Sequence, residues 1–203
     1  MPLQADATPD ERSSPFFKDY EQIADAWNEV ARMHGGTVEG VYNAYHFEAT
    51  LKCRVREYDV SAIGKREMMP PAFTMSASRI VGQSIVAVSI GRRMTATFQV
   101  QPRTLWNRSM AACTGKAVGH SLDGSFLIVA SDRGLLVWVL EKHAVINELM
   151  TYGLQSMALH RRGELVLHFK DLITQSMDLQ KVLQLSTRMV KQTEHNPEQL
   201  PVG

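Results

Sequence analysis

Basic side chains alternate along one stretch in the middle of the chain. Lys52, Arg54 and Arg56 occupy every second position, so an extended strand would place all three on one face. Arg92 and Arg93 lie in a short glycine-containing stretch that we expect to be a turn. We predict these five residues as a surface for an anionic partner, which could be an acidic protein, acidic lipid or nucleic acid. The alternatives are a solvated sheet face, or a face paired with the acidic residues of the first helix.

Positive charge is unevenly distributed along the chain. The 203 residues carry a net charge of only +1, which gives no general reason to expect nucleic acid or a membrane surface. Residues 1–50 contain 3 basic and 9 acidic side chains, whereas residues 51–120 contain 11 basic and 3 acidic ones. The positive charge is therefore concentrated in the middle third of the chain.

Metal and phosphate motifs are incomplete. The seven histidines form no close pair of the kind that a zinc site on one element requires, and the two cysteines form no metal knuckle. Gly115-Lys116 resembles part of a phosphate-binding loop, but Met110 stands where that loop needs glycine and Ala117 where it needs serine or threonine. We expect no metal and no cofactor.

Catalytic groups are equally sparse. Ser125 and Ser131 lack the flanking glycines of a nucleophile elbow. Cys113 and His120 would form a nucleophile and base only if the fold brought them together. An enzyme with a site assembled around residues 101–123 is therefore the alternative, and a non-catalytic interaction or adaptor domain is the leading hypothesis.

The N-terminal half predicts one helix followed by strands. Ser14-Pro15 is typical of a helix start, and apolar residues then recur with helical spacing up to Gly35-Gly36. Residues 47–55 alternate between apolar and polar, as in a half-buried strand. We expect a loop over 60–71, strands over 73–80, 85–90 and 94–100, and a hairpin about Gly91-Arg92.

The stretch FLIVASDRGLLVWVL, residues 126–140, has two interpretations. A strand pair ending near Trp138 would resemble one blade of a propeller, but no second copy occurs in the chain. Paired apolar residues continue with helical spacing to residue 150, so we favour a strand, a turn at Asp132 and then a helix. A hairpin with Gly163 at its turn and a helix over 174–191 complete the expected elements.

The segment GSFLIVASDRGLLVWVLEKHAVINEL, residues 124–149, resembles a strand–Asp–helix segment that recurs in a loose group of uncharacterised bacterial α+β proteins. The likeness in element order covers most of residues 16–192. It implies an α+β fold and carries no activity to any residue.

Together these patterns predict an α+β fold: an antiparallel β-sheet with an N-terminal helix, a helix after the central strands and a C-terminal helix. Residues 1–13 are expected to be a disordered tail, 14–192 a single domain and 193–203 a frayed tail. No leader and no apolar run long enough to span a bilayer is evident, so we expect a cytoplasmic protein whose partner is another protein. The sequence leaves the oligomeric state open.

Overall fold

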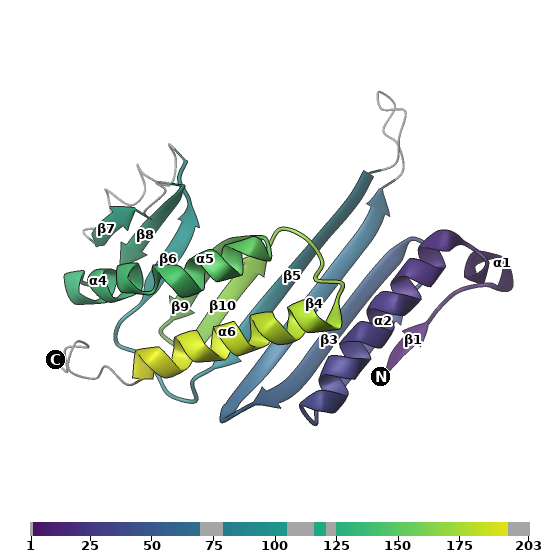
Figure 1. The fold of residues 1–203 in the computed structure, drawn as a ribbon, viewed down its shortest axis with the longest axis horizontal. Helices are drawn as coiled ribbons and strands as arrows, with labels where there is room; N and C mark the ends of the chain where they lie inside the picture. The colour runs from purple at the N-terminus through teal and green to yellow at the C-terminus, as the bar shows by residue number, and fades with distance from the viewer. Residues whose placement is uncertain (1, 70–78, 105–115, 121–124, 195–203) are drawn as a thin grey trace. The chain divides into compact units, whose positions relative to one another are not determined.

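The computed structural model describes residues 2–69, 79–104, 116–120 and 125–194. Its strands are β1 (Leu3–Ala5), β2 (Thr37–Tyr42), β3 (His46–Val55), β4 (Tyr58–Met69), β5 (Arg79–Ser89), β6 (Phe98–Pro102), β7 (Ala117–His120), β8 (Phe126–Ala130), β9 (Leu154–His160) and β10 (Glu164–Phe169). Its helices are α1 (Pro9–Arg12), α2 (Pro15–Met33), α4 (Arg133–Glu141), α5 (His143–Thr151) and α6 (Ser176–Glu194) (Figure 1). The predicted α+β class is confirmed.

The ten described strands form a mostly antiparallel sheet in the order β1-β2-β3-β4-β5-β10-β9-β6-β8-β7. The chain divides into two compact units. The first contains residues 1–86 and 169–183, and the second contains residues 87–168 and 184–203. The expectation of one domain over 14–192 stays a prediction, which limited proteolysis would test.

In the first unit, α2 packs on one face of β2 and β3. Ser14 caps the helix by accepting a hydrogen bond from the backbone N–H of Phe16, and Pro15 is its first residue. The buried stripe of the helix includes Trp27, whose ring meets that of Phe47 edge-on at a centroid distance of 6.0 Å. Gly35, at φ 59°, ends the helix as expected.

The expected loop over 60–71 is wrong for its first ten residues, because β4 runs through them to Met69. Gly64 suggested a loop, yet it lies inside the strand beneath Trp27 and Leu172. A Cβ at this position would lie 2.5 Å from the Trp27 ring. The glycine therefore allows a close approach of the helix instead of breaking the strand.

In the second unit, β8 leads through Asp132 into α4, so the choice of a helix over 134–140 is confirmed. The Asp132 side chain accepts a hydrogen bond from the backbone N–H of Leu135 at 2.8 Å and caps the helix. Buried α4 residues lie against β7 and β8. The capped helix buries Leu135, Leu136, Trp138 and Val139.

The hairpin with Gly163 at its turn is confirmed, because β9 and β10 are neighbours and Gly163 has φ 79°. The hairpin expected about Gly91 is wrong: β10 and β9 lie between β5 and β6 in the strand order. The strand expected over 94–100 is only partly right, since β6 begins at Phe98. Local alternation identified strand residues, but the pairing of strands depends on partners distant in sequence.

The chain ends differ from expectation in two respects. Residues 1–13, expected to be disordered, include β1, which pairs in parallel with β2, and the one-turn helix α1. At the other end, α6 continues to Glu194. Away from the ends, the sequence pattern predicts no regular element over 101–120, yet the structure has β7 there. None of the helices in the described residues is long and apolar enough to cross a membrane.

Candidate functional site

The alternation predicted for the basic strand is confirmed. Leu51, Cys53 and Val55 are buried, whereas Lys52 and Arg54 are exposed on the opposite face of β3. Arg56 is also exposed and lies in the turn before β4, at φ 58°. Because α2 packs on the face that holds Phe47, the exposed basic residues are on the face away from this helix.

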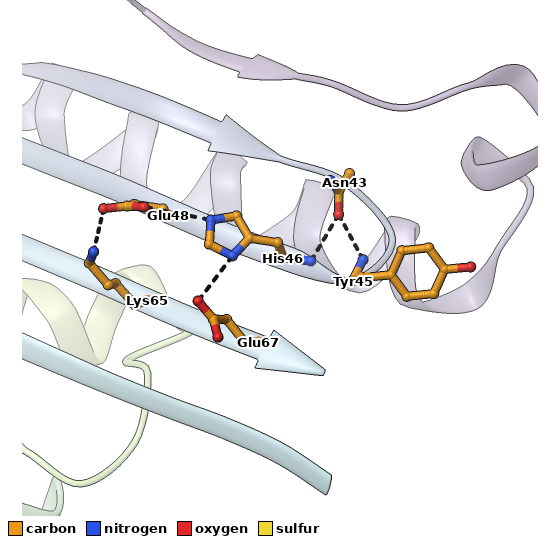
Figure 2. Close-up of polar contacts among 6 residues, drawn as sticks. All are labelled: Asn43, Tyr45, His46, Glu48, Lys65 and Glu67. Carbon is orange, nitrogen blue, oxygen red and sulfur yellow. Dashed lines mark hydrogen bonds and ion pairs between the residues drawn. The ribbon is translucent and has the colours of Figure 1, made fainter. Parts of the chain in front are cut away.

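We call the face of β3 and β4 that points away from α2 the open face. On it, carboxylates lie directly opposite basic residues of the neighbouring strand. Asp59 is the cross-strand partner of Arg54, and Glu48 is the partner of Lys65. The Lys65 Nζ and Glu48 Oε1 atoms form an ion pair at 2.5 Å. His46 lies between two glutamates, with ring nitrogens 3.6 Å from Glu48 Oε2 and 3.6 Å from Glu67 Oε1 (Figure 2). The open face of the first unit is therefore charge-mixed and not uniformly basic.

Hydrogen bonds at the start of β3 hold the turn that leads to His46. Asn43 Oδ1 accepts hydrogen bonds from the backbone N–H groups of Tyr45 and His46, which fixes the turn into β3 (Figure 2). The hydrogen bond from Lys65 lowers the pKa of Glu48, an effect that partial burial opposes. Glu48 is thus held as a carboxylate at neutral pH.

The acidic helix α2 forms an ion pair with Arg66, which is not one of the basic residues that the sequence suggested as its partners. Arg66 Nη1 donates to Asp19 Oδ2 at 2.8 Å, and its guanidinium lies 5.6 Å from the centre of the Tyr20 ring. Arg66 follows Lys65 on β4, so its side chain points to the helix-covered face. The alternative in which Lys52, Arg54 and Arg56 pair with the acidic residues of α2 is therefore wrong for the first unit.

Arg92 and Arg93 belong to the second unit, where the fold brings them to the β9–β10 turn. The backbone N–H of Ile90 donates to the Gly163 carbonyl, and that of Met94 donates to the Arg161 carbonyl, each at 2.8 Å. The Arg92 main chain lies directly against Gly163, where a Cβ would collide with it. The segment containing both arginines is thereby held against the hairpin.

Four exposed arginines consequently meet at one end of the second unit, and we call them the arginine cluster: Arg92, Arg93, Arg161 and Arg162. Arg162 forms an ion pair with Glu164, which is the acidic residue of the adjoining strand β10. The sequence pattern predicts a hairpin turn at Gly163, which Arg161 and Arg162 precede, and assigns these arginines no further role. The signal that could have identified them was a second pair of arginines in a second predicted turn.

A groove of about 680 Å³ adjoins this cluster in the second unit. Its lining residues are Thr97, Phe98, Gln99, Lys116, Val129, Ser131, Ala158, Leu159, His160 and Arg161. Among the described lining residues, the charged or ionisable members are Lys116, His160 and Arg161, and none is a carboxylate. A groove that combines these cationic or ionisable side chains with the hydrogen-bonding groups of Thr97, Gln99 and Ser131 suits an anionic ligand.

Ser131 in this groove does not form a nucleophile with a base. Its hydroxyl accepts a hydrogen bond from the backbone N–H of Thr97 at 3.2 Å and donates to Asp132 Oδ2 at 3.0 Å. The other oxygen of Asp132 caps α4. A catalytic serine needs a basic nitrogen to take its proton, and here the proton is directed to the capping carboxylate. The contacts are those of a turn linking β6, β8 and α4.

Other chemistry predicted from sequence finds little support in the described residues. Cys113 lies outside them, as do 105–115 and 121–124, which include much of the proposed enzyme site at 101–123. Burial raises the pKa of the Cys53 thiol to about 11, so it is a poor nucleophile at neutral pH. No group of histidine, cysteine and carboxylate residues suited to a metal ion occurs in the part of the chain that the structure describes.

No protein-family model matches this sequence, and none of the curated proteins matches it. Among solved structures, the fold is similar to the crystal structure of the mycobacterial trehalose monomycolate transport factor A, TtfA, with a TM-score of 0.48 and 9% sequence identity. The alignment covers 88% of this chain and 96% of that chain. A likeness at this level of identity and TM-score says nothing about what this chain binds.

Proposed function

We propose that this protein is a non-catalytic interaction module whose second unit binds an acidic segment of another protein. The observation that carries the proposal is the groove beside the arginine cluster: in the part of the chain that the structure describes, its ionisable lining residues are Lys116, His160 and Arg161, without a carboxylate. Cations gathered on one surface attract anionic partners and raise the rate of association.

The lining of the groove favours a peptide over a nucleic acid. The hydroxyl of Thr97 and the amide of Gln99 can exchange hydrogen bonds with a peptide main chain, while Val129 and Ala158 provide small apolar surface. Single-stranded nucleic acids rely on exposed aromatic rings for stacking, and the aromatic residue of the lining, Phe98, is buried. The proposed ligand is therefore an extended segment that alternates carboxylates with small side chains.

Fluorescence anisotropy with a labelled peptide of alternating glutamate and alanine tests the proposal. The variant R92A/R161A should bind the peptide about tenfold more weakly or worse, and with a flatter salt dependence, because two attractive charges are lost. The matched control K18A/R188A removes two exposed positive charges from the helices α2 and α6 and should bind like the wild type.

Two results would contradict the proposal. Equal weakening in both variants would indicate attraction to overall charge without a defined site. Tighter binding of single-stranded DNA than of the peptide, lost in R92A/R161A, would assign the surface to nucleic acid.

We also propose a cytoplasmic location, supported by the unpaired, buried thiol of Cys53, because free thiols are typical of reducing compartments. Fractionation of cells that express the tagged full chain would test this; recovery outside the cytoplasm would refute it.

A further inference from the structure

The open face of the first unit has a charge order that its strand register makes self-complementary. At three levels along the β3–β4 pair, the directly opposed residues complement one another. Arg54 is opposite Asp59 and Glu48 is opposite Lys65, while the His46 ring is opposite the Glu67 carboxylate. The two levels between them are uncharged on at least one strand, with Thr50 opposite Ile63 and Lys52 opposite Ser61. These pairs alternate with the buried residues below α2, so all of them belong to the open face.

Consider two copies whose open faces are stacked, related by a two-fold axis that lies between the sheets, parallel to the strands and above the midline between β3 and β4. This axis puts β3 of one copy over β4 of the other. It places each β3 residue of one copy above its own register partner on β4 of the other copy, at the same level. Arg54 then meets Asp59 of the second copy, Glu48 meets Lys65, and His46 meets Glu67. Every attraction within the sheet is repeated between the sheets, and Thr50 meets Ile63 at the centre.

We propose that the open face of β3 and β4 is the contact surface for a second copy of this chain, in an isologous dimer with the two-fold axis between these strands. Isologous dimers require one surface patch to complement itself, and aligned face-to-face packing is an established arrangement of sheets. The mixed charge of the face makes it a poor general attractor of either cations or anions. Its order of charges instead selects a copy of itself.

The surface is available for such a contact in the described part of the unit. Lys52, Arg54 and Asp59 are exposed, and the side chains of Lys65 and Glu67 are 42% and 58% exposed. These residues belong to a different unit from the arginine cluster, so the inference does not depend on the proposed peptide site.

Charge-reversed variants of the full chain test the dimer in sedimentation velocity runs over a range of concentrations. The acidic-face variant R54E/K65E and the basic-face variant E48K/D59K each set like charges against like charges in a homodimer. Each should associate at least about tenfold more weakly than the wild type. The control variant K18E/E21K reverses two exposed charges on α2 and should dimerise normally.

Two rescue experiments separate the contact between copies from the ion pairs within one copy. An equimolar mixture of R54E/K65E and E48K/D59K should form a one-to-one heterodimer, since every opposing charge is then complementary although the pairs within each copy remain broken. The quadruple variant E48K/R54E/D59K/K65E restores all pairs with reversed polarity and should dimerise like the wild type. Circular dichroism melting curves verify that each variant is folded.

The proposal is overturned if the wild type sediments as a monomer at every concentration. It is also overturned if the two double variants dimerise as strongly as the control. Failure of the mixture to form a heterodimer would place any wild-type interface on another surface and would likewise contradict it.

Discussion

Replacement of Gly64 by alanine should destabilise the first unit, although alanine is ordinarily the better strand residue. The new Cβ would lie 2.5 and 2.6 Å from two ring atoms of Trp27 and 2.6 Å from Leu172 Cδ1. Trp27 is 0% exposed, and its indole N–H donates to the Ile173 carbonyl at 2.9 Å. The ring therefore cannot move aside without losing a buried hydrogen bond.

The magnitude follows from two opposing effects. Overpacking a core costs about 1–3 kcal/mol, whereas glycine inside a strand costs about 0.5–1 kcal/mol relative to alanine. The net expectation for Gly64→Ala is a loss of about 1–2 kcal/mol in the free energy of unfolding, measured by denaturation in urea. Gly82→Ala is the matched control, because its Cβ would approach Leu172 no closer than 3.1 Å, and it should cost less.

A double-mutant cycle identifies the cause. Trp27→Phe removes the two ring atoms that the Gly64→Ala methyl group would strike and leaves only the end of the flexible Leu172 side chain close to it. Alanine at position 64 should therefore cost much less in that background. The expected coupling is about 1–2 kcal/mol, of the size found for residues in contact. The reasoning is refuted if Gly64→Ala is as stable as the wild type, or if its cost is unchanged when residue 27 is phenylalanine.

Three further outcomes are expected. Leu51→Ala should lower the free energy of unfolding by about 2–5 kcal/mol while Lys52→Ala stays within about 0.5 kcal/mol, as measured by denaturation in urea; similar costs would contradict the strand register. In a Cys113→Ser background, Cys53 should react with a thiol reagent at pH 8 only after unfolding, because burial raises its pKa to about 11 and keeps it protonated; rapid labelling of the native protein would show that the thiol is accessible. Asp132→Ala should cost about 0.5–2 kcal/mol by removing the cap of α4, and no change in thermal melting would show that the cap is dispensable.

Local patterns were sufficient for the elements whose burial has a simple period. The helical spacing of apolar residues in α2, with its Ser14 cap, and the alternation of β3 both follow from the sequence, because one face of each element contacts the core and the other meets water. The same reasoning correctly preferred a helix after Asp132, since a carboxylate there can cap its first turn.

Tertiary structure alone decided which distant segments meet. Gly64 indicated a loop because glycine is common in turns. It lies inside β4 instead, where the Trp27 ring of α2 occupies the space that a Cβ would need. The two strands flanking Gly91 looked like a hairpin, but the β9–β10 pair lies between them. For the candidate sites, the sequence identified Lys52, Arg54, Arg56, Arg92 and Arg93 as basic and exposed. Their surroundings, Asp59 opposite Arg54 and the β9–β10 turn beside Arg92, depend on strand register and strand order, which are set by pairing over long separations in the chain and leave no periodic signal in it.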